Sequence, residues 1–356
     1  KICSYVTICS SNVCRDTSAD HCKDSSQIET NATMTSETFF YSHARFALVE
    51  ALRMTGVGPG NEVLLPAFIC RDVLASINHL GASAVFYQVD RSLSPLELVK
   101  RDSIKAVIAV NYFGFPQDLK PFVSYANETG VGIVEDNAHG WLSKDSEGRL
   151  LGTRTAVGIT SFRKTIRVVN GAVLHVSDGA NNFVSPQQVD TNIDSLPLAF
   201  RLRRIAARIE RRSGIPLLRL LRNTTRALRK TTSGSALPQS SYRSEVNLPD
   251  DARPHQDSLD HYKSLNQEIE IRRRRHLYSL VQQKLASAPI QPIFTTLPEG
   301  VAPYGYPFFC ESADLPVVER SLRKLSVEVI SWPDLPSAVE TGAPGFYQQV
   351  RLVNFL

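Results

Sequence analysis

Six short apolar segments, each bounded by turn-forming residues, constrain the fold of this chain more than any other feature. They are EVLLP, AVFYQV, KAVIAVN, GVGIVE, AVGITSF and AVLHV, over residues 62–66, 84–89, 105–111, 130–135, 156–162 and 172–176. Several show no apolar–polar alternation, which is typical of strands covered on both faces. Helical spacing over 46–55 and helix-length segments at 71–79 and 117–129 accompany them. This order predicts an α/β layer fold with a mainly parallel sheet.

The chain divides into four expected regions. Residues 1–36 lack a hydrophobic period and are expected to be a disordered or non-native tail, and 37–190 form the large α/β domain. A basic helical insert and linker occupies 191–250, and a smaller α+β C-terminal domain occupies 251–356. In that last region we expect helices at about 258–286 and 313–324, and strands at 291–296, 306–310 and 327–331.

Charge and hydropathy narrow the class of protein. No apolar segment approaches the roughly 20 residues that span a bilayer, and the first residues lack the apolar core of a secretory signal. The net charge is +5, yet residues 201–230 hold eleven Arg or Lys against one acid. That segment has no aromatic residue for base stacking, which argues against nucleic acid. Its apolar face (Leu202, Ile205, Ala206 and Ile209) predicts either a helix packed on the body or one docked on anionic lipid or a nucleotide diphosphate.

The cysteines are unevenly distributed. Four of the six fall within the first 22 residues without a C-x-x-C pair, so the tail is favoured over a zinc site, although His21 beside Cys22 leaves zinc as an alternative. Only Cys70 and Cys310 occur in the rest of the chain. This usage is typical of a reducing compartment and predicts a cytoplasmic protein.

Several common enzyme motifs are absent. The sequence has no G-x-G-x-x-G, G-x-x-x-x-G-K-[ST], H-E-x-x-H or G-x-S-x-G, which argues against Rossmann dehydrogenases, P-loop NTPases, zincins and α/β-hydrolases. Instead, polar residues follow two predicted strands as EDNAH (135–139) and SFRKT (161–165), and SHAR (42–45) precedes a predicted helix. The carboxyl ends of parallel strands meet at the edge of a sheet where ligands bind, and a helix start there favours a phosphate.

A phosphate seat, a carboxylate and a lysine are the groups that pyridoxal 5'-phosphate (PLP) requires. Lysine forms a Schiff base with this cofactor, and an acid beside the pyridine nitrogen keeps that nitrogen protonated. Each group alone has a plain alternative, because a strand-end Asp usually caps a turn and a Lys after a strand usually faces solvent.

Beyond these residue types, the chain from about 39 to 335 resembles the DegT-type (DegT/DnrJ/StrS) sugar aminotransferases, which are fold-type-I PLP enzymes. The resemblance is carried by SHARFALVEAL, PGNEVLLPAFIC, GASAVFYQVD, AVNYFGFPQDL, GVGIVEDNAHG, SFRKT followed by NGAVL, and RRRRHLYSL. It implies a PLP-binding large domain and a homodimer. It also implies transfer of an amino group from an amino acid such as glutamate to a nucleotide-linked keto-sugar, in surface polysaccharide or secondary-metabolite biosynthesis.

The resemblance assigns the reactive end of the site to three residues. Lys164 matches the lysine that forms the Schiff base, and Asp136 matches the aspartate that pairs with the pyridine nitrogen. His139 takes a position, often Gln in relatives, near the ring hydroxyl.

The phosphate end and the ring face are assigned in the same way. Ala44 and Arg45 replace a Gly-Thr or Gly-Arg step whose backbone holds the phosphate, and Ser161 matches a further phosphate contact. In the segment that supplies the ring-stacking aromatic, only Phe68 has a suitable side chain. No metal is expected in this site.

The chain departs from the family pattern in several places. Lys164 follows Ser161 by three residues instead of five, and the family's Glu-Gly-Gly is Asn170-Gly171-Ala172. Ala44 loses the conformational freedom of a glycine if its position needs a positive φ. The partner-subunit Asn-x-Arg segment is not evident. Residues 272–275 are expected to form the exposed start of a long helix, and the C-terminus is expected to be truncated.

Two alternatives stay open. A non-catalytic relative would keep the fold as a scaffold or sensor and use the basic helices as its working surface. A PLP-dependent sugar dehydratase would share the fold, although some such relatives replace the lysine by histidine, which Lys164 argues against.

Overall fold

The computed structural model describes residues 36–177, 184–213, 242–325 and 327–356. Thr35–Leu356 form one compact unit. The expected tail, with its four cysteines and the alternative zinc site, lies outside the described residues, apart from Ser36, and so does the basic segment 214–230. The boundaries at 190/191 and 250/251 stay predictions.

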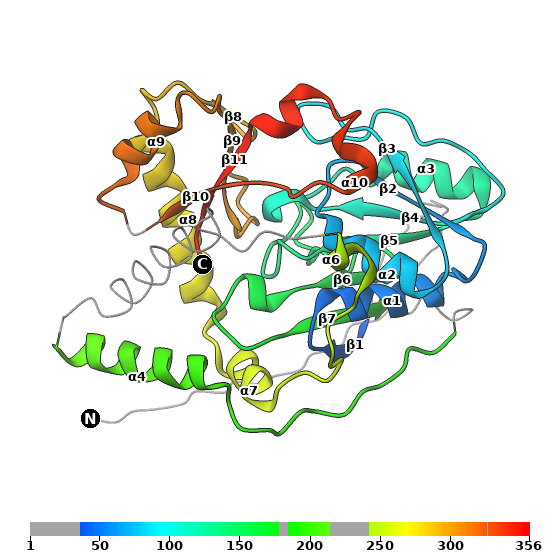
Figure 1. Ribbon diagram of the computed structural model, residues 1–356, viewed down its shortest axis with the longest axis horizontal. Helices are drawn as coiled ribbons and strands as arrows, with labels where there is room; N and C mark the ends of the chain where they lie inside the picture. Colours follow the sequence, from blue (N-terminus) through cyan, green and yellow to red (C-terminus); the bar gives the residue numbers. More distant parts are fainter. Residues whose placement is uncertain (1–35, 178–183, 214–241, 326) are drawn as a thin grey trace, which may run out of the picture. The chain divides into compact units, whose positions relative to one another are not determined.

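A seven-stranded sheet forms the centre of the fold, in the order β1-β7-β6-β5-β4-β2-β3 (Figure 1). The strands are β1 Ser36–Tyr41, β2 Glu62–Pro66, β3 Ser83–Tyr87, β4 Ile104–Val110, β5 Gly132–Asn137, β6 Val157–Thr160 and β7 Ala172–Ser177. Five neighbouring strands, β3, β2, β4, β5 and β6, pair in parallel. Strand β7 runs antiparallel to both β6 and β1. The prediction of a mainly parallel α/β sheet is therefore confirmed. The edge strand β1 was not predicted.

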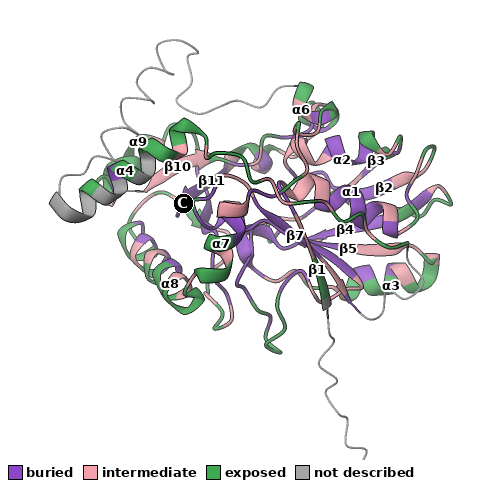
Figure 2. Ribbon diagram, turned by 90° about the horizontal axis from the view of Figure 1, so that it is seen from below, coloured by how far each residue is buried: buried purple, intermediate pink, exposed green. Residues whose placement is uncertain are grey.

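The first helix of the sheet layer places its amino end beside the carboxyl ends of the strands. This helix, α1 (Ala44–Met54), packs against β6 and β7, and its residues Ala47, Leu48, Ala51 and Leu52 are fully buried at the predicted helical spacing. The other elements of this part are η1 Arg71–Val73, α2 Leu74–His79, η2 Tyr112–Gly114, α3 Lys120–Thr129 and η3 Phe162–Lys164. Figure 2 shows the buried residues concentrated along the strands and on the inner sides of α1 and α2.

A second, antiparallel sheet of four strands has the order β10-β11-β9-β8. Its strands are β8 Gln291–Pro292, β9 Gly305–Phe309, β10 Glu328–Ser331 and β11 Val350–Asn354, and its helices and turns are α8 Gln267–Lys284, α9 Leu315–Leu322, α10 Ser337–Glu340 and η5 Gly345–Gln349. The expected strand at 291–296 keeps only its first two residues. The strand β11, which was not predicted, lies inside the sheet between β10 and β9.

The expected helix over 258–286 is two helices, so that prediction was wrong. Helix α7 (Gln256–Ser264) ends before Leu265, and α8 begins after Asn266, whose side chain accepts the N–H of Ile269 and so caps a new helix. The expectation for 272–275 was also wrong. These residues lie inside α8, and Arg274 is completely buried.

The remaining helices are α4 (Leu198–Ser213) and α6 (Arg243–Val246). In α4, Leu198, Leu202 and Ile205 are 67%, 53% and 51% exposed, whereas Ala206 is buried. The apolar stripe of this helix therefore faces outward over much of its length. No helix within the described ranges is long and apolar enough to cross a membrane.

Candidate active site

One cavity of about 270 Å³ brings together six of the residues that the sequence assigned to the site. It lies where β5 and β6 end and α1 begins, and Tyr304 and Trp332 from the C-terminal part also line it. The six assigned residues that line it are Lys164, Asp136, His139, Ser161, Ala44 and Arg45.

Lys164 is held on a short turn directly after β6. Its backbone N–H donates to Ser161 O at 3.2 Å, and the next N–H, of Thr165, donates to Phe162 O at 2.9 Å. The ring of Phe162 is completely buried against the backbone of Gly171, where an added Cβ would lie 2.0 Å from Phe162 Cζ. Because φ of Gly171 is also +144°, only glycine fits this position without displacing the turn.

Asp136 lies near the end of β5 and is 5% exposed. Its Oδ1 accepts the N–H of Ala138 at 2.9 Å. Burial raises the pKa of this carboxyl above its usual range, while the Ala138 N–H and the charge of Lys164 act in the opposite direction. The Asp136 carboxylate therefore depends on nearby positive charge for its ionisation.

His139 connects Lys164 to an aromatic stack. Its Nε2 lies 3.2 Å from Lys164 Nζ, and its ring stacks on Tyr304 with a centroid distance of 4.6 Å and an interplanar angle of 5°. Burial and, secondly, the charge of Lys164 lower the pKa of His139 well below its usual value. The imidazole is therefore neutral near pH 7, and its Nε2 can accept a proton of the Lys164 amine.

The other end of the cavity is built to receive an anion. The first turn of α1 contains no acid, and the side chain of its N-cap, His43, makes no capping hydrogen bond. Ser161 Oγ and Arg163 Nε are both buried without a hydrogen-bond partner. Burial, Arg163 and Arg45 together lower the pKa of His43 to about 4. These observations indicate positive charge with unpaired donors, which an anion would satisfy. An acid, Asp72, also lines this cavity, and its Oδ1 is buried without a partner.

Two expectations at the edge of the cavity need correction. Among the described residues, the non-glycine positions with positive φ are Leu93, Phe113 and Leu142, so Ala44 carries no cost of a left-handed backbone. Phe68 is completely buried, and its ring packs on Trp332 at 5.1 Å and on Tyr347 at 4.8 Å outside the cavity lining. The position of Phe68 therefore does not support it as the ring-stacking residue, which the sequence had left unassigned.

The lining residues without a role from the sequence include two in segments already quoted and two from a distant part of the chain. Arg163 and His43 belong to the quoted segments SFRKT and SHAR, so their positions beside Lys164 and at the start of α1 could have indicated them. Tyr304 and Trp332 come from the second sheet region, more than 130 residues along the chain from Lys164, and no local pattern marks them.

Known proteins resemble this chain in sequence and in structure. The model of the DegT/DnrJ/EryC1/StrS aminotransferase family matches residues 40–181. A UDP-N-acetyl-3-dehydro-alpha-D-glucosamine 3-aminotransferase from Acidithiobacillus ferrooxidans is 30% identical over 121 residues, which are 33% of this chain and 32% of that protein. The match thus spans about a third of the length of that relative.

The solved structures extend the likeness over most of the chain. The aminotransferase TlmJ from Streptoalloteichus hindustanus has a TM-score of 0.55 and 21% identity, covering 89% of this chain and 79% of its own. The putative sugar aminotransferase Spr1654 from Streptococcus pneumoniae, in its PLP form, has a TM-score of 0.54 and 17% identity, with 89% and 81% covered. At these identities the structures show the fold, which agrees with the expected α/β architecture. In sequence, residues 40–181 of this chain are similar to the DegT/DnrJ/EryC1/StrS aminotransferase family.

Proposed function

We propose that this chain is a PLP-dependent aminotransferase that moves an amino group from an amino acid, with glutamate as the expected donor, to a nucleotide-linked keto-sugar. The observation that carries the proposal is the convergence of Lys164, Asp136 and an anion-binding end in one cavity. The related 3-aminotransferase from Acidithiobacillus ferrooxidans, whose name specifies a UDP-linked keto-sugar, supports the substrate class.

The anion end fits the phosphate of PLP. Ser161 Oγ and Arg163 Nε supply two buried donors that lack partners. The first turn of α1, with Ala44 and Arg45 on the cavity wall, adds backbone N–H groups and the positive end of the helix dipole. These residues would hold the phosphate and would thereby fix the position of the ring along the cavity.

The opposite end fits the reactive part of the cofactor. When bound, PLP supplies an electron sink for the transfer of an amino group. The Asp136 carboxylate would hold the protonated ring nitrogen, and the Lys164 amine would hold the aldehyde end of the cofactor. The Lys164 amine would also take the proton from the substrate carbon that bears the nitrogen and would later return it. Neutral His139 accepts a hydrogen bond from Lys164 Nζ and so orients that amine.

The proposal also covers partners and setting. The family resemblance supports a homodimer, a cytoplasmic location and a place in surface polysaccharide or secondary-metabolite biosynthesis. The outward apolar stripe of α4, beside exposed Arg201, supports peripheral contact with anionic lipid. Co-sedimentation with phosphatidylglycerol vesicles tests this contact. A Leu202→Asp/Ile205→Asp protein that sediments as well as the wild type would contradict it.

Turnover distinguishes the aminotransferase from its two alternatives. The full chain with PLP is mixed with L-glutamate and a panel of nucleotide-linked 3-keto and 4-keto sugars, and amino-sugar and 2-oxoglutarate are measured by mass spectrometry. We expect equal amounts of both products with at least one sugar and none with Lys164→Ala. A deoxysugar without an amino group would indicate a dehydratase. Bound PLP without turnover of any amino donor or sugar would favour a scaffold.

A further inference from the structure

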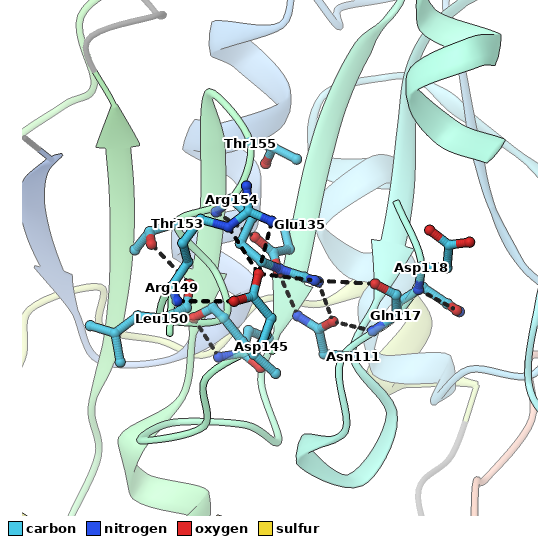
Figure 3. Close-up of polar contacts among 12 residues, drawn as sticks. Asn111, Gln117, Asp118, Glu135, Asp145, Arg149, Leu150, Thr153, Arg154 and Thr155 are labelled. Carbon is cyan, nitrogen blue, oxygen red and sulfur yellow. Dashed lines mark hydrogen bonds and ion pairs between the residues drawn. The ribbon is translucent and has the colours of Figure 1, made fainter. Parts of the chain in front are cut away.

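Glu135, the residue before Asp136 in β5, forms a buried ion pair with Arg154 (Figure 3). Glu135 is completely buried, and Arg154 Nε donates to its Oε1 at 2.7 Å. The backbone N–H of Arg154 donates to the other carboxylate oxygen, Oε2, at 2.9 Å. The Arg154 side chain is only 5% exposed. Both oxygens of Glu135 are therefore held by a single arginine residue, away from solvent.

Asn111 connects this ion pair to the cavity. Its Nδ2 donates to Glu135 Oε1 at 2.8 Å, and its Oδ1 accepts Arg154 Nη2 at 2.9 Å and the backbone N–H of Gln117 at 2.9 Å (Figure 3). The backbone N–H of Asn111 donates to the carbonyl oxygen of Asp136 at 2.9 Å, and Asn111 also lines the cavity. The network thus joins Arg154 to the strand end that carries Asp136.

Each buried carboxylate of this network has an arginine partner without Asp136. Glu135 is paired with Arg154, and Asp145 is paired with Arg149 at 2.9 Å and lies 4.0 Å from Arg154. The cation that acts on Asp136 is Lys164, which also lines the cavity. Without Arg154, the charge of Glu135 would lie uncompensated in the residue next to a second buried carboxylate.

The other groups around Asp136 add no positive charge. The buried phenols of Tyr87 and Tyr112 have pKa values raised well above the usual range by burial, so both are neutral. His139 is neutral for the opposite reason, since burial lowers its pKa. Asn111, which follows β4, and Ile159 and Thr160 in β6 carry no charge. Two neighbouring buried carboxylates with too little positive charge do not both stay ionised.

We propose that Arg154 is a positioning residue that keeps Asp136 ionised by cancelling the charge of Glu135, and that it thereby sets the acid limit of cofactor binding. This inference rests on the proposed function, because it assigns Asp136 to the ring nitrogen of the cofactor. It gives Arg154 an electrostatic role as well as its structural one, and the two roles have different consequences on substitution.

The test uses pyridoxamine 5'-phosphate, which has the ring nitrogen and phosphate of PLP but no aldehyde for Lys164. Its Kd is measured by calorimetry from pH 5 to 9. We expect Arg154→Met to move the acid midpoint of binding upward by about one pH unit, with about tenfold weaker binding below it. Glu135→Gln leaves Arg154 unpaired and should move the midpoint downward. The Glu135→Gln/Arg154→Met protein should return close to the wild-type midpoint.

Opposite shifts in the two single variants support the charge role. A purely structural role of Arg154 would weaken binding in both single variants and most in the double variant, and that result would overturn the inference. An unchanged acid midpoint in Arg154→Met would overturn it as well. If Arg154→Met does not fold, the acid midpoint of Glu135→Gln tests the charge role. A downward shift supports that role, and an unchanged or raised midpoint overturns it. Arg101→Met, which removes an exposed partner of Glu62, is the matched control and should leave the midpoint unchanged. Failure of the wild type to bind the probe would instead overturn the proposed function.

Discussion

Replacing Arg274 by methionine tests how the Lys164 turn is fixed to the rest of the protein. The Arg274 guanidinium is completely buried and donates to three backbone carbonyls, those of Thr165, Pro303 and Tyr304, and to the carboxylate of Glu270. Thr165 follows Lys164 directly, and the ring of Tyr304 stacks on His139. One side chain therefore holds both the turn of the reactive lysine and the ring behind its histidine partner.

The magnitude follows from what the substitution leaves unpaired. Glu270 keeps its contact with Arg273 at 2.6 Å, so the main loss is at the three buried carbonyls. Removing one member of a buried, hydrogen-bonded charged group costs about 3–5 kcal/mol. Arg273→Met is the matched control, because Arg273 is the neighbouring residue of α8 but is 42% exposed. Its loss should cost no more than about 1 kcal/mol.

Urea unfolding followed by circular dichroism measures both values in the same buffer. We expect Arg274→Met to lose at least about 2 kcal/mol more than Arg273→Met and to bind PLP more weakly, because the Thr165 carbonyl is released beside Lys164. Equal free energies of unfolding in the two variants, with unchanged PLP affinity, would refute the reasoning.

Three further predictions concern the cavity and its turn. Arg163→Met should weaken the binding of inorganic phosphate and of PLP by about tenfold or more, because a charge-assisted hydrogen bond is worth about 1.5–3 kcal/mol. The control Arg167→Met, at a residue outside the cavity lining, should change either Kd less than twofold. Equal losses of affinity in the two variants, measured by calorimetry, would contradict the phosphate site. Burial lowers the pKa of His175 to about 4, and burial together with two arginines does the same for His43. Between pH 6.5 and 4 the unfolded chain then binds more protons than the folded chain, so the free energy of unfolding should fall by on the order of 1–3 kcal/mol as the pH falls through this window. The fall should be less steep in His175→Gln than in the wild type. Identical slopes in urea titrations of His175→Gln and the wild type would show that His175 is not the cause. Gly171→Ala should destabilise by more than about 2 kcal/mol, since its Cβ would overlap the Phe162 ring. Gly148→Ala, which also has a positive φ (+79°) but faces open space, should cost about 1–2 kcal/mol. The same loss of Tm in both would contradict the close packing under the Lys164 turn.

Local pattern predicted six of the seven strands of the large sheet, and the family resemblance assigned six residues of the cavity wall. Buried parallel strands are continuous apolar segments, so β4 and β5 and the polar residues that follow them were visible in the sequence. The edge strand β1 was missed because its SET start is polar and its partner, β7, lies more than 130 residues away. The strand β11 was missed because VRLVN is too short to be distinguished from a chain end without its neighbours β9 and β10.

The residues that escaped prediction depend on contacts between distant parts of the chain. Four consecutive arginines indicate solvent exposure, yet Arg274 is buried because carbonyls from two other segments, and one carboxylate on its own helix, receive its donors. Arg154 likewise gives no local signal, and its importance follows only from its contact with Glu135. By contrast, the helix break at Asn266 had a signal, since Asn is a preferred N-cap residue.

Borohydride reduction of the PLP-loaded full chain, followed by peptide mass spectrometry, tests most directly whether Lys164 and Asp136 form one cofactor site. We expect a single phosphopyridoxyl group, on the peptide that contains Lys164, and none in Lys164→Ala. Asp136→Asn should carry the same label but bind the cofactor more weakly. Label on another lysine, or no label at saturating PLP, would contradict the account.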